Sequence, residues 1–302
     1  MYLGMPITIT DAVITASSIA ETDHAAWLVG TTYAALDRVI MTATHKIYES
    51  VTGGNLGNSP DTDDGSNWIE VSATEKWKPF DQVLNIQAAS ASDITYTFEI
   101  PPGTVVDSVA LFNMDASSVG ITIDNLVSDE IYDTGTLILA DNEGIADAWS
   151  YCFNPISTLP YYLFSDLPAF GGYDLHLTIS NGASPVSVGQ IVLCSTRKIG
   201  TALDSTEIGF IDFSTIERDD FGRPSIVLRP FIDRVNFQIA METYTAGVVR
   251  RLITSRRGVP NVYFAGKDIQ SFGTLIYGIH GQLDIPLGVR ISRASLEVQG
   301  LT

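Results

Sequence analysis

The stretch ITYTFEIPPGTVVDSVALFNMDASSVGITIDNLV, residues 94–127, decides the fold class. It holds three runs in which apolar side chains alternate with polar ones, at 94–100, 107–114 and 120–127. Alternation with a period of two is typical of strands that bury one face, because successive side chains point to opposite sides. Pro, Gly, Asn and Asp bound each run, as expected for turns between short strands. The stretch therefore predicts consecutive strands of an all-β domain.

The same pattern continues to residue 196 and defines a domain over 86–196. Five further strands are expected, at 135–140, 148–155, 161–167, 173–180 and 186–194. Eight short strands at this spacing predict a jelly-roll or a similar β-sandwich.

Residues 197–302 have a different character and are expected to form a separate domain. A long strand or strand pair is predicted over 225–242, followed by the one convincing helix, at about 243–257. Apolar residues recur in that helix at spacings of three and four, and Gly258 is placed to end it. Three strands, 261–266, 273–285 and 290–301, complete a predicted β-barrel or sandwich with one helix packed on it.

The first 85 residues are expected to form an extended N-terminal segment, 1–30, and a small β unit, 31–85. Two strand-like runs, LDRVIM (36–41) and HKIYESV (45–51), form a predicted hairpin. A loop rich in Gly, Asn, Asp and Pro follows over 53–67, and Trp68 then begins another strand. Residues 76–80 are expected to dock this unit onto the next domain.

Charge is distributed unevenly along the chain of 302 residues. Residues 1–196 carry 4 Lys and Arg against 24 Asp and Glu, a net charge of −20, whereas residues 197–302 carry 13 against 11, a net charge of +2. The acidic part disfavours nucleic acid as a partner, because phosphates would be repelled. The asymmetry predicts at least two regions in different electrostatic surroundings.

Neither membrane insertion nor secretion is expected. No run of 18 apolar residues occurs, and the first ten residues lack the basic and apolar regions of a signal peptide. Cys152 and Cys194 are the only cysteines. We expect both to be buried free thiols rather than a disulfide, in a protein that is made in a reducing cytoplasm.

Aromatic side chains of the N-terminal unit are the candidate ligand-binding residues. Trp27, Tyr33, Tyr48 and Trp77 are candidates for a platform on which a sugar ring stacks. The alternative is that these rings form the core of a small unit, which is the role expected for Trp68.

Metal binding and catalysis find little support in the sequence. Asp61, Asp63 and Asp64 crowd one loop and are weak candidates for calcium, but Asx-turns explain them equally well and the spacing is not that of an EF-hand. The four histidines lie in separate segments, and no GxSxG, P-loop or dinucleotide motif is present. We therefore expect no enzyme activity and no cofactor.

Four arginines, Arg250, Arg251, Arg256 and Arg257, form a basic edge on the predicted helix. Their spacing places Arg250 and Arg257 on one face. They are candidates for a subunit interface with the acidic surface of a neighbouring copy; DNA contact and simple solvation are the alternatives.

The unit from Tyr33 to Trp68 resembles the small chitin-binding type of carbohydrate-binding module. The positions that match are Tyr33, Asp37, Val39, Tyr48, Pro60 and Trp68, and Leu36 stands where that family has a turn glycine. The resemblance implies a compact β unit that binds a glycan through exposed aromatic rings.

The whole chain resembles a class of tailed-bacteriophage virion proteins. The resemblance rests on ITITDAVITASSIAE (7–21), TDDGSNWIEVSATEKWKPFD (62–81), DSVALFNM (107–114) and IERDDFGRPSIVLRPF (216–231). It implies a tail-tube-like C-terminal domain that assembles with copies of itself and with other tail proteins. The chain would then be made in the host cytoplasm, reside in the phage tail and display its N-terminal part toward host glycans. The alternative is a free-standing carbohydrate-binding protein without catalysis.

Overall fold

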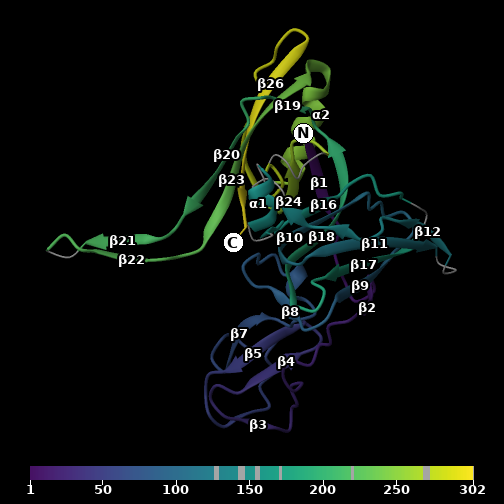
Figure 1. Ribbon diagram of the computed structural model, residues 1–302. Helices are drawn as coiled ribbons and strands as arrows, with labels where there is room; N and C mark the ends of the chain where they lie inside the picture. Colours follow the sequence, from purple (N-terminus) through teal and green to yellow (C-terminus); the bar gives the residue numbers. More distant parts are fainter. Residues whose placement is uncertain are drawn as a thin grey trace.

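The computed structural model describes residues 1–125, 129–141, 147–153, 157–169, 172–218, 221–267 and 273–301. It is mainly β, as predicted, and its curled sheets form a sandwich and a half-barrel (Figure 1). No helix in this described part of the chain is long and apolar enough to cross a membrane.

A large antiparallel sheet of eleven strands forms the centre of the molecule. Its main order is β16-β10-β18-β1-β24-β25-β26-β23-β19, with β8 beside β18 and β20 beside β23. Its strands are β1 (Tyr2–Pro6), β8 (Ala88–Ser90), β10 (Ser108–Asp115), β16 (Tyr162–Phe164), β18 (Val186–Lys198), β19 (Thr201–Ala202), β20 (Glu207–Asp212), β23 (Phe231–Glu242), β24 (Asn261–Phe264), β25 (Ile276–Asp284) and β26 (Ile291–Gly300).

A second sheet, of six strands, packs against one end of the first and forms the predicted sandwich. Its main order is β12-β11-β17-β9-β2, with β13 beside β11. Its strands are β2 (Ile14–Ser17), β9 (Ile94–Ile100), β11 (Ser118–Asn125), β12 (Glu130–Asp133), β13 (Leu137–Ile138) and β17 (Tyr173–Ser180). In β9, Ile94, Tyr96, Phe98 and Ile100 point into the shared core while the residues between them face outward, which confirms the predicted alternation.

The strands β10 and β18 are buried on both faces. Val109 and Leu111 of β10 contribute to the sandwich core, whereas Ala110 and Phe112 belong to a second apolar cluster on the other face. Successive side chains of a strand point to opposite sides, so one strand serves both clusters.

The N-terminal unit forms two small sheets with a core of its own. Its strands are β3 (Thr32–Tyr33), β4 (Arg38–Met41), β5 (Lys46–Ser50), β6 (Asn55–Leu56) and β7 (Trp68–Ala73). The hairpin of β4 and β5 and the strand that begins at Trp68 agree with the prediction. A short 3-10 helix, η1 (Lys78–Phe80), follows, and Trp77 and Phe80 pack into the sandwich core, as expected for a docking segment.

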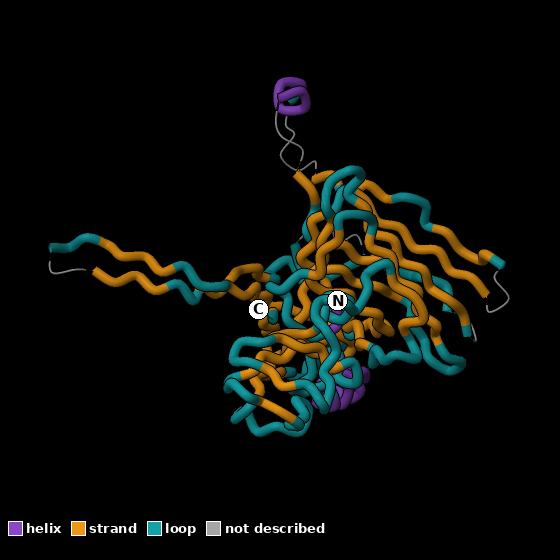
Figure 2. Tube along the Cα trace, turned by 90° about the horizontal axis from the view of Figure 1, so that it is seen from below, coloured by secondary structure: helices purple, strands orange, loops and turns teal. Residues whose placement is uncertain are grey.

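Two elements differ from the prediction. Residues Ala148–Phe153, expected in a strand, form the short helix α1, between the two-residue strands β14 (Ala140–Asp141) and β15 (Ser157–Thr158). The run AWSYCF has no strict alternation, and Figure 2 shows α1 standing apart from both sheets, so no sheet neighbour holds it extended. The helix expected at 243–257 consists of a 3-10 turn, η2 (Thr243–Thr245), and α2 (Ala246–Ser255).

The predicted boundary between residues 196 and 197 lies inside β18, which is continuous from Val186 to Lys198. The N-terminal strand β1 pairs with β18 on one side and with β24 on the other. The expected sandwich and C-terminal regions therefore share one sheet, while each keeps its own apolar core.

Candidate functional site

A β-arm is the most prominent feature of the surface. It comprises residues 213–218 and 221–230 and carries the paired strands β21 (Thr215–Arg218) and β22 (Pro224–Val227). Figures 1 and 2 show from two directions that it extends away from the rest of the molecule, as a continuation of β20 and β23. The predicted strand over 225–242 is thus a pair, interrupted at residues 228–230, where Pro230 removes a backbone donor.

The arm is apolar although it contacts no core. Ile216 and Ile226 lie opposite each other on its two strands and are 64% and 58% exposed. Val227 and Leu228 are 52% and 84% exposed. Several large apolar side chains exposed on one extension mark an interaction site, so the arm has the character of an interaction element.

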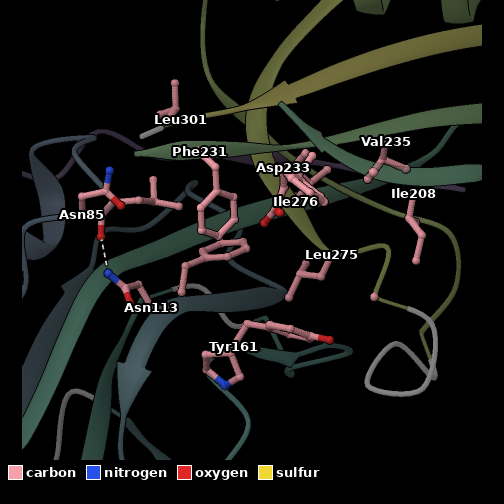
Figure 3. Close-up of a pocket in the computed structure, with 16 residues that line it drawn as sticks. Asn85, Asn113, Tyr161, Ile208, Phe231, Asp233, Val235, Leu275, Ile276 and Leu301 are labelled. Atoms are coloured by element: carbon pink, nitrogen blue, oxygen red, sulfur yellow. Dashed lines mark hydrogen bonds between the residues drawn. The ribbon is translucent and has the colours of Figure 1, made fainter. Parts of the chain in front are cut away.

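An apolar groove of about 640 Å³ lies at the root of the arm (Figure 3). Its walls come from β20 and β23 at the arm root, from β10, from the start of β25, and from residues 84–85, 160–161 and 301, so segments far apart in sequence meet here. The lining residues are Leu84, Asn85, Phe112, Asn113, Pro160, Tyr161, Ile208, Gly209, Phe210, Phe231, Asp233, Val235, Gly273, Leu275, Ile276 and Leu301.

Aromatic rings and fixed amides shape the groove. Phe210 and Phe231 meet edge to face with their ring centroids 6.1 Å apart, and both remain largely exposed. The Asn113 Nδ2 donates to the Leu84 carbonyl at 2.6 Å, and Gln87 Nε2 donates to the Asn113 carbonyl at 2.8 Å. These bonds hold one wall in place beside the floor of the groove, which is lined by the buried residues Phe112, Leu275 and Ile276.

Asp233 is the acidic group of the groove. Within the described part of the chain its carboxylate has no hydrogen bond and no ion pair. Partial desolvation at the mouth of the groove raises the pKa of Asp233, although its side chain is exposed at the rim. Tyr161 is the other titratable lining residue, so the groove offers no pairing of a nucleophile with a base.

The arginines of α2 form a second candidate surface. Ala246, Val249 and Ile253 face the core, while Arg250, Arg251 and Arg257 surround a shallow hollow on the outside together with Gly247, Thr254 and Ser255. As the spacing predicts, Arg250 and Arg257 share this hollow. Arg256 does not: it lines a different depression, near Pro6 and Tyr277. None of the four forms an ion pair with another described residue.

The residues predicted to stack on a sugar are mostly inside the protein. Tyr33 and Tyr48 are buried with Val39 and Trp68 in the core of the small unit, where Tyr33 meets Trp68 edge to face at 5.2 Å. Trp77 is buried and stacks on His45 at 4.1 Å. Only Trp27 is partly exposed. The expectation that these four rings form an exposed platform is therefore wrong, because a unit this small needs them for its core; Trp68 has the core role predicted for it.

Asp63 organises the acidic loop from within. Its two carboxylate oxygens accept hydrogen bonds from the backbone of Gly65, Asn67 and Trp68 and from the Asn67 side chain, at 2.8–3.0 Å. These bonds lower the pKa of Asp63 to about 2. Asp61 and Asp64 make local turn contacts, with the Ser59 hydroxyl and the Ser66 backbone. Among the described residues no cluster of three metal-ligating side chains occurs.

The two cysteines differ in surroundings. Cys194 is fully buried, as expected, and burial raises the pKa of its thiol. Cys152, expected to be buried, is exposed on α1, beside Trp149 and Phe153, which are 70% and 65% exposed and whose ring centroids lie 4.1 Å apart. The two thiols are not bonded to each other.

The sequence interpretation missed the arm, the groove and this aromatic pair. The segment 216–231 contained a signal for the arm, since Ile216, Ile226 and Leu228 are flanked by Pro224, Pro230 and several charges. The sequence contained no signal for the groove, because the groove is assembled from several segments that lie far apart in the chain.

Comparison with known proteins gives one match. No protein-family model and no curated protein matches the chain. One solved structure does: a mutant of chitosan-binding module 1 from a chitosanase/glucanase of Paenibacillus sp. IK-5, with 15% identity over 39% of this chain and 83% of that chain, and a TM-score of 0.25. A likeness this slight transfers neither a fold nor a ligand. The comparisons give no support to the virion assignment, which stays a prediction.

Proposed function

We propose that this protein is a non-enzymatic structural subunit that assembles with copies of itself through the β-arm. The observation that carries the proposal is the arm itself: an apolar two-stranded extension that no other described part of the chain covers. An isolated two-stranded hairpin is marginally stable in water at best, so a partner surface is the natural source of its order.

The energetics favour burial of the arm in an assembly. Fully burying one large aliphatic side chain contributes about 1.5–3 kcal/mol. Ile216, Ile226, Val227 and Leu228 are 52% to 84% exposed, so burying their remaining exposed surface contributes on the order of 4–8 kcal/mol, before the cost of association is subtracted. This is enough for a specific interface when further contacts accompany the arm.

We place this assembly in the tail of a bacteriophage, at the tube, tip, baseplate or neck. The support is the resemblance of four segments of the sequence to tailed-phage virion proteins, one of which, 216–231, is the arm. In this setting the partners are other copies of the chain and other tail proteins, and the protein resides in the virion after synthesis in the host cytoplasm.

An arm deletion tests the proposal. In the variant, residues 213–230 are replaced by Asn-Gly, a two-residue turn that joins the paired strands β20 and β23. We expect the full chain to form a defined oligomer by light scattering and electron microscopy, and the variant to be a monomer with an unchanged far-UV circular dichroism spectrum of its sheets. A full-length chain that stays monomeric at high concentration would contradict the proposal.

Glycan binding is the second candidate function, and the exposed rings of Trp149 and Phe153 favour it. Exposed aromatic faces suit the apolar face of a sugar ring. On a glycan array we expect any binding to disappear in Trp149→Ala and to persist in Trp27→Ala. Binding that depends on Trp27 instead would support a glycan platform at Trp27. If no glycan on the array binds the protein, the glycan-binding hypothesis is rejected.

A further inference from the structure

The arm and the groove are complementary features of one chain. The arm presents apolar side chains that no other described residue covers, and the groove is a hollow with a mainly apolar lining. We infer that the groove is the acceptor for the arm of a second copy, with Arg218 of that copy paired to Asp233 at the rim. This inference rests on the proposed self-assembly and names its contact surface.

The arm cannot occupy the groove of its own chain. β20 and β23 are paired along Glu207–Asp212 and leave the body together, and the arm continues them outward (Figure 1). The groove lies at the root of this ribbon, so the arm would have to fold back through its own base to reach it. A second copy has no such restriction.

Charge complementarity supports the same pairing. Asp233 has no cationic partner among the described residues, and Arg218 has no anionic one. Asp233 is exposed at the rim of the groove, so a guanidinium that approaches it from a second copy forms a charge-assisted hydrogen bond. The pair therefore fixes which part of the arm lies at the rim of the groove.

The backbone offers a second element of recognition. β20 pairs with β23 along one edge, and its other edge has no partner strand among the described residues. A side chain at Gly209 would meet nothing within 4 Å, so the approach to this edge is open. β21 contains no proline and is able to add to it as a further strand, whereas β22 begins with Pro224.

An arm of one copy in the groove of the next is a heterologous contact. Each copy contributes one arm and one groove, so every copy has two neighbours. Repetition of such a contact closes into a ring or continues as a helix, depending on the rotation between copies.

Site-specific cross-linking tests the inference. One protein carries Ile216→Cys on the arm and the other Ile208→Cys at the groove, both with Cys152→Ser; Cys194 is fully buried and therefore unreactive. Because each protein has one accessible thiol, a short bis-maleimide reagent that joins unlike chains reports an intermolecular contact. Ile138→Cys, on the exposed strand β13 of the sandwich, replaces the groove thiol in the matched control.

We expect a covalent heterodimer from Ile216→Cys with Ile208→Cys, in at least tenfold excess over the Ile138→Cys control. Asp233→Arg should abolish this cross-link, and the exchanged pair Asp233→Arg with Arg218→Asp should restore it. Oligomers that give no heterodimer above the control would overturn the groove as acceptor and leave self-assembly standing. The absence of oligomers would overturn both.

Discussion

Leu36 has a backbone conformation that glycine prefers. Its φ is 72°, in the left-handed region, and its side chain is 74% exposed. The Leu36 N–H donates to the Ser50 carbonyl at 2.7 Å, so the turn is held in this conformation by the neighbouring strand. The turn is therefore made with leucine in a conformation that favours glycine, at a cost in backbone energy.

Replacing this leucine should stabilise the small unit. We expect Leu36→Gly to raise the free energy of unfolding by about 0.5–1 kcal/mol, because relief of the left-handed strain exceeds the entropy that glycine adds to the unfolded chain. Denaturant titration followed by tryptophan fluorescence measures it. Leu28→Gly is the control: Leu28 is also exposed but has no positive φ, and the change should destabilise. Equal effects at both sites would contradict the explanation.

Asp63 gives the small unit a specific pH dependence. Hydrogen bonds from the loop lower the pKa of its carboxyl group from 3.8 to about 2. A group with a lowered pKa in the folded state stabilises that state above its ordinary pKa, and this stabilisation is lost as the pH falls. We expect the unit to lose stability between about pH 4 and pH 2, by fluorescence-detected unfolding, and Asp63→Asn to remove much of this dependence. Asp64→Asn, which loses one turn contact, should keep it.

At the level of elements, α2 combines an apolar inner face with a basic outer face that forms no ion pair with the described residues. Residues 86–196 contain 13 Asp and Glu and no Lys or Arg, so in the proposed assembly the sandwich of a neighbouring copy would offer the opposite charge. Exposed charges at an interface act mainly on association and are screened by salt.

A charge reversal on α2 should weaken assembly. We expect Arg250→Glu with Arg251→Glu to raise the dissociation constant by at least tenfold at low salt, or about 1.4 kcal/mol, and by less at high salt. Analytical ultracentrifugation at two salt concentrations measures this. Arg290→Glu with Arg293→Glu, two exposed residues beside and on β26, makes the same change in net charge outside α2 and is the control. An equal loss of affinity between copies in the control would mean that net charge, and not the position of the arginines on α2, causes the effect.

The elements that the sequence predicts well are those whose pattern is local. Period-two alternation identifies β9, and spacing of three and four identifies α2, because each buries one face against a neighbour. The arm and α1 are exceptions: neither packs on a sheet, so alternation carries little information about them. The groove and the burial of Tyr33 and Tyr48 depend on contacts between distant segments, which a single sequence does not contain.

On the scale of the whole molecule, β1 connects the acidic part of the chain to the near-neutral C-terminal part, because it pairs with a strand of each. The change of net charge at residue 196 suggested a domain boundary, yet β18 continues through it and β1 bridges β18 to β24. The charge pattern describes the surface of the protein, whereas the pairing of strands is determined inside it, so a change of net charge along the chain does not mark the end of a sheet. Cooperativity of unfolding should follow the sheet, and the small unit, which has a separate core, should unfold by itself.

A cavity in β1, the strand that connects β18 to β24, tests whether the shared sheet unfolds as one unit. Leu3 is fully buried on β1 and packs in the core beneath α2. Leu3→Ala should cost about 2–5 kcal/mol and lower the midpoint of the main thermal transition, followed by far-UV circular dichroism, by about 10 °C.

The tryptophans separate the two units in the same experiment. In a Trp149→Phe background, two of the three remaining tryptophans, Trp27 and Trp68, lie in the small unit. Their fluorescence transition should stay in place in Leu3→Ala while the circular dichroism transition moves as one step, because β1 links the sandwich to the C-terminal strands and not to the small unit. A circular dichroism transition that splits, with only part of it shifted, would show that the sandwich and the C-terminal strands unfold independently despite the shared sheet.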